Sequence, residues 1–271
     1  MGDPKFRFAG EPWRLRPARE PVRPVVASIP HAGVAVPAAI AARFASEAIS
    51  GLPMTDWHLD QLYDFLPDLG IVTLIATQSR FVADCNRPPD GGALYPGRFE
   101  TGMIPTRTFD GDPVWTEVPD AEWIAEAQTR VWQPYHDRLE ALLGEWRRRF
   151  GKVALLDLHS VSSQPNLISP RLEQDVFLGD REGRSAEPWV RDAVRQAYET
   201  GGFTVAVNRP YKGGYITDHY GRPPVVQALQ IEMAERVYLD ERCPKERDPV
   251  VWQGARERIL GVWKAFLGAF E

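Results

Sequence analysis

The stretch that decides the fold is Val-Ala-Leu-Leu-Asp-Leu-His-Ser at residues 153–160. Five of its first six residues are apolar, which is typical of a strand buried on both faces of an α/β sheet. Asp157, His159 and Ser160 stand at its carboxyl end, where open α/β sheets bind their ligands. A histidine there can bind a metal through one ring nitrogen while a carboxylate orients the other. A buried strand closed by a capping turn would show the same pattern, so other segments have to decide.

The composition is that of an ordinary globular protein. Of 271 residues, 44% are hydrophobic and 25% are charged, which is enough to bury a full core. The formal net charge of −5 argues against nucleic acid or an anionic membrane as the main partner. Cys85 and Cys243 lack metal-type spacing, and so few cysteines fit a reducing cytoplasm. No apolar run follows Lys5 and none reaches about 18 residues, so neither a signal peptide nor a membrane span is expected.

Other segments predict the elements around this strand. Residues 79–87 alternate polar and apolar side chains, which predicts a strand leading into a loop. Pro134 is expected to kink or divide the long helix that contains it. Residues 88–119 and 208–221 are expected to be loops, the first a packed cover and the second able to close on an anionic ligand. Further strands are predicted at 22–29, 71–76, 175–178, 203–207 and 225–231, and helices at 55–69, 121–150, 187–198 and 250–270.

Candidate site residues stand at the ends of these elements. His31 follows the strand 22–29, a position that favours a ligand, although a lone histidine is more often a hydrogen-bonded loop residue. Asp56 either caps a helix or presents a carboxylate to a metal. Glu232 follows the apolar run 225–231, where a carboxylate is costly unless it is paired or used.

These residues match the chemistry of amide hydrolysis. Two histidines and one carboxylate form a common catalytic zinc set with water in the open position. We therefore predict that His31, His159 and Asp56 hold Zn²⁺ or another divalent metal. Glu232 would take the proton from the water, and Arg87 would bind substrate charge.

Several short motifs occur in an order that is far more specific than any one of them. They are Ser-Ile-Pro-His-Ala-Gly at 28–33, Thr-Asp-Trp-His-Leu-Asp-Gln-Leu-Tyr at 55–63, Ser-Arg-Phe-Val-Ala-Asp-Cys-Asn-Arg-Pro at 79–88, Leu-Tyr-Pro at 94–96, Thr-Phe-Asp-Gly at 108–111, Leu-Asp-Leu-His-Ser at 156–160, Lys-Gly-Gly-Tyr-Ile-Thr at 212–217 and Leu-Gln-Ile-Glu at 229–232. From about residue 22 to about residue 241, the chain resembles the N-formylglutamate amidohydrolases. The resemblance implies a single domain over 1–271, related to the zinc carboxypeptidases, with a three-layer α/β/α sandwich around a mixed, mostly parallel sheet. It also implies removal of formate from N-formyl-L-glutamate in histidine degradation.

The similarity to zinc carboxypeptidases adds roles by position. Asn86 and Arg87 look like the pair that holds the substrate's carboxylate. Ser160 resembles the serine that follows the second metal histidine, and Glu232 resembles the catalytic glutamate. Carboxypeptidases have a glutamate three residues after the first histidine, where this chain has Val34.

The third metal ligand must therefore come from elsewhere, and we choose Asp56 with His219 as the alternative.

The implied substrate carries two carboxylates, so an acidic protein has to supply positive charge locally. The resemblance suggests Arg87 for one carboxylate and Arg209 or Lys212 for the other. Arg80 is assigned to catalysis with Glu232, and Asn86, Ser160 and Thr217 are further predicted substrate contacts.

The expected partner is a small dicarboxylate, without nucleic acid or membrane, and the chain is expected to be a monomer or a small homo-oligomer. Another N-acyl amino acid, or a short peptide, is the alternative substrate. A binding protein that lost catalysis is a third interpretation, against which the intact His31, His159 and Glu232 argue.

Overall fold

The computed structural model describes residues 6, 8, 10–95 and 97–268. Pro96 of the motif at 94–96 and the last residues of the helix predicted at 250–270 lie outside this described part.

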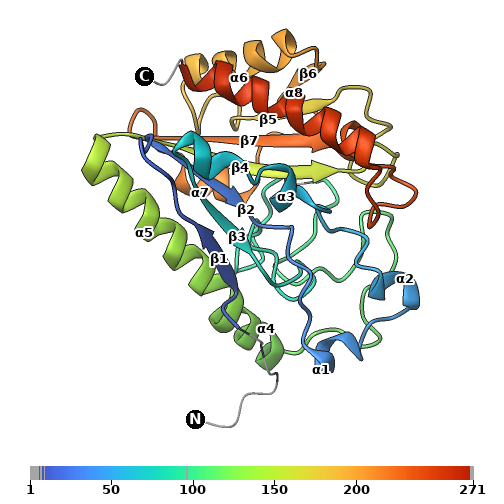
Figure 1. Cartoon of the computed structure of the whole chain (residues 1–271). Helices are drawn as coiled ribbons and strands as arrows, with labels where there is room; N and C mark the ends of the chain where they lie inside the picture. Colours follow the sequence, from blue (N-terminus) through green and yellow to red (C-terminus); the bar gives the residue numbers. More distant parts are fainter. Residues whose placement is uncertain (1–5, 7, 9, 96, 269–271) are drawn as a thin grey trace.

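A seven-stranded mixed sheet forms the centre of the molecule (Figure 1). Its strands are β1 (Trp13–Arg16), β2 (Val25–Ile29), β3 (Val72–Ala76), β4 (Val153–Val161), β5 (Val176–Gly179), β6 (Val205–Val207) and β7 (Val226–Ala234). They are arranged in the order β1-β3-β2-β4-β7-β5-β6. The four central strands run parallel, β1 is antiparallel to β3 at one edge, and β5 with β6 runs antiparallel to β7 at the other. The predicted mixed, mostly parallel sheet is therefore confirmed.

Helices cover both faces of the sheet, which confirms the α/β class. The helices are α1 (Ala38–Ala41), α2 (Glu47–Ser50), α3 (Leu59–Leu62), α4 (Ala121–Ala127), α5 (Gln133–Phe150), α6 (Pro188–Thr200), α7 (Tyr215–Tyr220) and α8 (Pro249–Leu267). Helices α3, α6 and α8 contribute to the hydrophobic cluster on one face, whereas α5 and α7 contribute to the cluster on the other. In Figure 1, α6 and α8 lie above the sheet and α5 lies below it to the left.

Strand β4 shows how the sheet leads to the site. Leu156 and Leu158 point into the cluster beneath α6 and α8, and Leu155 points to the opposite face, beneath α5. Because side chains alternate along a strand, Asp157 and His159 continue the face of Leu155. That face is apolar under α5 and becomes polar toward the carboxyl ends of the strands.

Two predicted strand ends lie further along than expected. β4 continues to Val161 and β7 to Ala234, so His159 and Glu232 lie within strands and not after them. The strand expected at 79–87 is wrong, because these residues form turns. The Asp84 carboxylate accepts the Asn86 backbone N–H at 2.8 Å, a local bond that competes with sheet pairing.

The helix predicted at 55–69 is also interrupted. Only α3 and a 3-10 turn at Leu66–Leu69 form, because His58 adopts a left-handed φ of 60° before α3 and Pro67 has no N–H to continue a helix. The loop predicted at 208–221 contains α7, and β1 forms at residues 13–16, where the sequence predicts no strand.

The long helix is divided as Pro134 predicts. A π-helical turn at Gln128–Trp132 joins α4 to α5. Pro134 has no N–H to donate to the carbonyl four residues earlier. The wider π-helical turn before it accommodates this missing hydrogen bond. Gly151 then ends α5 with a positive φ of 77°.

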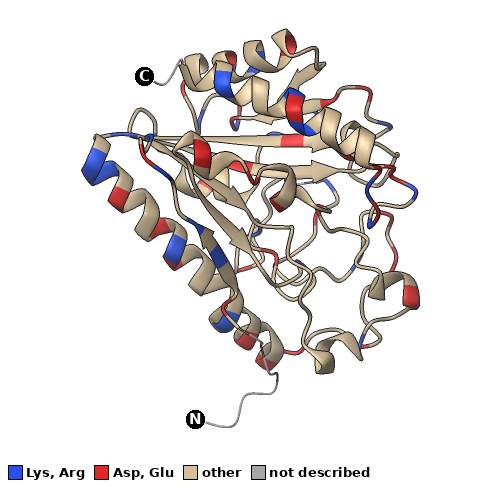
Figure 2. Cartoon of the chain, in the orientation of Figure 1, with Lys and Arg blue, Asp and Glu red and all other residues tan. Residues whose placement is uncertain are grey.

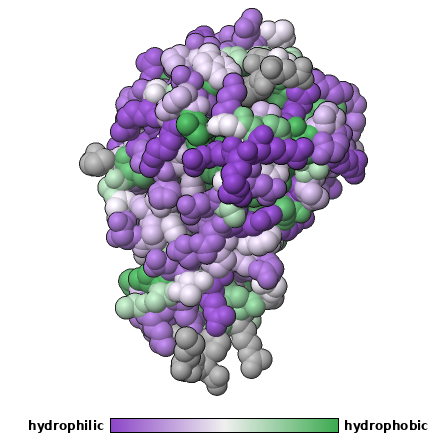
Figure 3. Space-filling view, turned by 90° about the vertical axis from the view of Figure 1, so that its left-hand side faces the viewer, coloured by the Kyte–Doolittle hydropathy of each residue, from purple (hydrophilic) through white to green (hydrophobic). Residues whose placement is uncertain are grey.

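Charged residues lie mainly on the outer helices and loops, and the strands carry few of them (Figure 2). The face on the α5 side is largely hydrophilic with scattered apolar side chains (Figure 3). None of the helices among the described residues is both long and apolar enough to cross a membrane.

Leu156→Ala tests whether the two-sided burial of β4 holds the sheet together. Leu156 is 0% exposed, so its truncation should leave a cavity and lower the free energy of unfolding by about 2–5 kcal/mol. Leu167→Ala, at a side chain that is 55% exposed, is the control and should change it by less than about 0.5 kcal/mol. Urea unfolding measures both, and equal losses would contradict this view of β4.

Candidate active site

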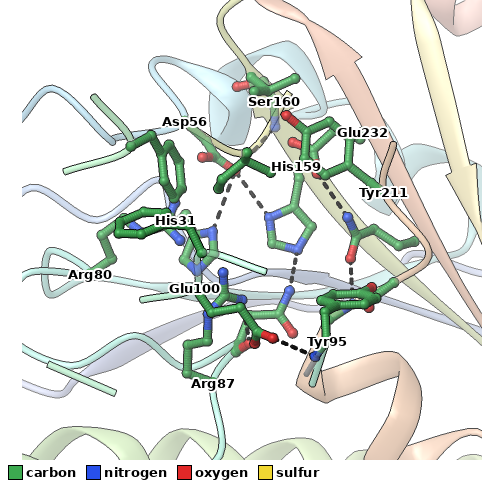
Figure 4. Close-up of a pocket in the computed structure, with 18 residues that line it drawn as sticks. His31, Asp56, Arg80, Arg87, Tyr95, Glu100, His159, Ser160, Tyr211 and Glu232 are labelled. Carbon is green, nitrogen blue, oxygen red and sulfur yellow. Dashed lines mark hydrogen bonds and ion pairs between the residues drawn. The ribbon is translucent and has the colours of Figure 1, made fainter. Parts of the chain in front are cut away.

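Three buried side chains from separate segments meet at the carboxyl edge of the sheet (Figure 4). His31 follows β2, Asp56 precedes α3, and His159 lies on β4. One ligand atom from each lies within 4.8 Å of the others. The Asp56 Oδ2 atom is 3.2 Å from His159 Nδ1 and 3.9 Å from His31 Nδ1. All three residues are at most 3% exposed, and the structure therefore brings the three predicted ligands together in one buried cluster.

A carboxylate behind the first histidine holds its ring. The Nε2 atom of His31 lies 2.7 Å from Asp84 Oδ1. The second Asp84 oxygen accepts two bonds from Arg80, from Nε at 3.1 Å and from Nη2 at 2.6 Å. Although burial alone would raise it, the Arg80 guanidinium and His31 hold the pKa of Asp84 well below its usual range. His31 therefore presents Nδ1 to the centre of the cluster.

The second histidine is held in the same way. His159 Nε2 lies 3.0 Å from Asp157 Oδ2, and the other Asp157 oxygen accepts the Ser28 hydroxyl at 3.0 Å. Burial alone would lower the pKa of His159, but Asp157 and Asp56 outweigh it and raise that pKa well above the usual value. A carboxylate on the outer nitrogen of a histidine is the usual arrangement around a metal site.

The cluster fits a divalent metal. Two imidazole nitrogens and a carboxylate oxygen are a donor set that catalytic zinc uses, with a position left for water. His219, the alternative third ligand, is not part of the cluster. It lies on α7, where its ring stacks on Tyr215 with ring centroids 4.9 Å apart.

Glu232 lies directly beside the cluster. It pairs with His159 in the register of β4 and β7, it is 7% exposed, and it lines the same pocket. The Gln230 side-chain amide donates to it at 2.8 Å. Burial raises the pKa of Glu232 to about 7, and a carboxyl group with such a pKa can accept a proton near neutral pH.

The pocket in front of the cluster has a volume of about 90 Å³. At the end away from Asp56 it is lined by Arg87, Tyr95 and Glu100 (Figure 4). The Arg87 Nε atom donates to the Thr101 carbonyl at 3.0 Å and Nη1 to the Asn86 carbonyl at 3.0 Å. Within the described part of the chain, Nη2 of Arg87 has no partner, so it is available for a substrate anion.

Three other predicted residues line the pocket, but their polar groups are already engaged within the protein. Arg80 is bound to Asp84, so it acts on the site through that carboxylate. Asn86 accepts the Ile216 backbone N–H at 2.8 Å, and its amide nitrogen lies 3.1 Å from Asp157. The Ser160 backbone N–H donates to Asp56 at 3.1 Å.

The remaining predicted substrate residues lie elsewhere. Arg209 and Lys212 line a separate cavity of about 1040 Å³, where Lys212 pairs with Glu182 at 2.6 Å. Thr217 is fully buried and donates to the Gly214 carbonyl at 2.9 Å. The structure therefore does not place these three side chains in the pocket that Arg87 lines.

Sequence reasoning missed several residues of the site. Asp84, Glu100, Tyr211 and Gln230 were not among the predicted site residues, although Asp84 and Gln230 lie within the motifs at 79–88 and 229–232. All four touch either a cluster histidine or the pocket. Residues 79–87 contain two arginines, an aspartate and an asparagine, many polar side chains for a strand. This was the available signal, but the alternation of polar and apolar residues led to the prediction of a strand.

A mixed α/β sheet that carries a buried His-Asp-His cluster beside a glutamate defines an α/β protein with a hydrolase-type site that can hold a metal. The family model for N-formylglutamate amidohydrolase matches residues 23–239, and the chain belongs to that family. It is therefore an amidohydrolase, an enzyme that hydrolyses an amide C–N bond.

Similar proteins agree with this assignment. An N-formylglutamate deformylase from Pseudomonas putida is 39% identical over 226 residues, 82% of this chain and 84% of that protein. One from Pseudomonas aeruginosa is 40% identical over 228 residues, with the same coverage. The crystal structure of an N-formylglutamate amidohydrolase from Ralstonia eutropha JMP134 has a TM-score of 0.81 and 27% identity, covering 95% of this chain and 98% of that one.

Asp84→Asn tests the role of the carboxylate behind His31. The change removes the anion that orients the ring and leaves Arg80 without its partner, so affinity for a divalent metal should fall about 10- to 100-fold. Competition with a chromogenic chelator measures this affinity. Asp68→Asn, at an exposed ion pair with Arg19, is the matched control, and equal affinities in the two variants would contradict the assignment.

Proposed function

We propose that this protein hydrolyses N-formyl-L-glutamate to formate and L-glutamate in a metal-dependent reaction. The observation that carries the proposal is the position of Glu232, which lies in register with His159 beside the His31–Asp56–His159 cluster. The two deformylases that are 39% and 40% identical support the choice of substrate. With this substrate, the reaction would belong to histidine degradation. Cys85 and Cys243 are free thiols, which are typical of a reducing compartment, so we place the reaction in the cytoplasm.

His31, Asp56 and His159 would hold the metal, and their donor set suits Zn²⁺. When bound, such an ion polarises a carbonyl oxygen and lowers the pKa of water. The protein's own contribution is to orient both imidazoles through Asp84 and Asp157 and to exclude bulk solvent from the buried cluster.

Glu232 is the group that moves the proton. It takes one proton from water as the water oxygen forms a bond to the formyl carbon. The C–N bond then breaks, and Glu232 gives the proton to the leaving amine nitrogen, which yields formate and the free amino group of glutamate. A pKa raised to about 7 by burial lets the carboxylate accept and return the proton near neutral pH.

Arg87 supplies charge to the amino-acid part of the substrate. Its guanidinium lines the pocket at the opposite end from Asp56 and Ser160 (Figure 4). Nη2 of Arg87 has no partner among the residues that the structure describes. A charge-assisted bond from it to a substrate carboxylate would fix the distance between that carboxylate and the scissile amide.

The test is hydrolysis of N-formyl-L-glutamate by the purified protein, with formate and glutamate measured in parallel. Equal amounts of both products are expected. N-acetyl-L-glutamate, N-formyl-L-alanine and a short peptide ending in glutamate form the comparison panel. Faster hydrolysis of any of these than of N-formyl-L-glutamate would contradict the proposed substrate.

The pH profile tests Glu232 as the base. The carboxylate works only after it has lost its proton, and burial raises its pKa. kcat/KM should therefore rise with pH along a limb whose midpoint lies above about 4.3, the ordinary glutamate value.

Glu232→Gln should lower kcat/KM by about 10²- to 10⁴-fold, retain the metal and lose this limb. A wild-type profile whose limb is centred at the ordinary glutamate pKa, or wild-type activity in Glu232→Gln, would overturn the assignment of Glu232 as the base.

Arg87→Ala tests the substrate contact. Loss of one charge-assisted hydrogen bond should lower kcat/KM by about 10- to 100-fold, mainly through a higher KM. Arg148→Ala, at an exposed arginine on α5, is the control and should leave both constants unchanged. An unchanged kcat/KM in the Arg87 variant would remove this residue from the site.

A further inference from the structure

A second cavity of about 100 Å³ adjoins the pocket. We refer to it as the side chamber. It shares with the pocket the lining residues Asp56, Arg80, Phe109, Ser160 and Val161. Its lining includes none of the residues at the opposite end of the pocket, namely Arg87, Tyr95 and Glu100. The side chamber therefore lies beyond the cluster, on the far side from the proposed amino-acid contact.

The side chamber reaches the protein surface. Its lining includes Asp110, Gln164 and Pro165, all of which are exposed. A small molecule in the side chamber can thus exchange with solvent at these residues, without passing the Arg87 end of the pocket.

A buried acid that the proposed mechanism does not use lines the side chamber. Glu235 follows β7 and is 7% exposed. Its carboxyl group has no hydrogen-bond or ion-pair partner within the described part of the chain, although a buried polar group normally has one. Burial, with the nearby carboxylates of Asp56 and Glu241, raises the pKa of Glu235 well above its usual range. A protonated carboxyl group can donate one hydrogen bond to an anion.

The wall between the two cavities carries a positive charge. Arg80 is 5% exposed. Its Nη1 atom donates to the Met54 carbonyl at 3.3 Å, and its guanidinium lies 5.1 Å from the centre of the Phe109 ring. Met54 and Phe109 both line the side chamber. A small anion there would lie near the buried guanidinium of Arg80 and the carboxyl group of Glu235.

We propose that the side chamber is the binding site for the small carboxylate product, formate. The inference rests on the proposed function, because it takes the Arg87 end of the pocket for the amino-acid carboxylate. With that end occupied, the formyl carbon at the cluster faces the Asp56–Ser160 end, which opens into the side chamber. Formate then leaves past Gln164 while glutamate is still held by Arg87. Arg80 stabilises its charge and Glu235 donates a hydrogen bond to it.

The experiment titrates the metal-loaded protein with ¹³C-labelled sodium formate and follows binding by NMR. Glu235→Ala should weaken formate binding about tenfold through loss of one charged hydrogen bond, and Glu235→Gln, which keeps a donor, should restore most of it. Binding of L-glutamate should not change in either variant. Glu246→Ala, at an exposed glutamate, is the control.

A second pair of variants keeps the test independent of changes to a buried residue. Gln164→Trp narrows the opening of the side chamber and should slow formate exchange. Leu167→Trp, in the same loop but outside both linings, should not. Equal formate affinity in wild type and Glu235→Ala would overturn the inference, as would formate exchange in Gln164→Trp that is as fast as in wild type. Displacement of formate by L-glutamate would also overturn it. If formate binding depends on Glu235 but the protein does not hydrolyse N-formyl-L-glutamate, only the proposed function is overturned.

Discussion

The site depends on the burial of the Asp56 carboxylate. A charged carboxylate at 2% exposure is stable only if its oxygens are bound. Asp56 Oδ2 lies 3.2 Å from His159 Nδ1 and accepts the Ser160 backbone N–H at 3.1 Å. Its own backbone N–H donates to the His31 carbonyl at 3.1 Å. Through its carboxylate and its backbone N–H, Asp56 therefore ties three separate segments together, and these bonds also leave two imidazole nitrogens facing a common centre.

The register of the sheet positions the side chains around the cluster relative to one another. The parallel register sets Asp157 opposite Ser28 on β2 and His159 opposite Glu232 on β7. Because β4 is apolar on both faces up to Leu156, the strand cannot slip by one residue without burying Asp157 in the hydrophobic cluster on the other face. The register therefore fixes the distance between His159 of the cluster and Glu232, the proposed base.

The sequence predicted the sheet and the cluster better than the pocket around them. Apolar runs identified β2, β3, β4 and β7, and the three predicted ligands His31, Asp56 and His159 lie together in the structure. The alternation at residues 79–87 predicted a strand wrongly, because the Asp84 carboxylate accepts the Asn86 backbone N–H and bonds to His31. Sequence periodicity reveals neither contact. Arg209 and Lys212 were chosen for their charge, but strand β6 and the loop after it direct them to another cavity. Contacts between distant loops, such as Tyr95 with the Gly213 carbonyl, leave no local signal.

The central claim is that this cluster hydrolyses a formyl amide through a bound metal. The most direct measurement is formate release from N-formyl-L-glutamate by the protein as isolated, after removal of metal by a chelator, and after addition of Zn²⁺. We expect activity that the chelator abolishes and Zn²⁺ restores, and neither His31→Ala nor His159→Ala should be restored. Activity that survives complete removal of metal, or no formate release by protein that carries zinc, would contradict the claim.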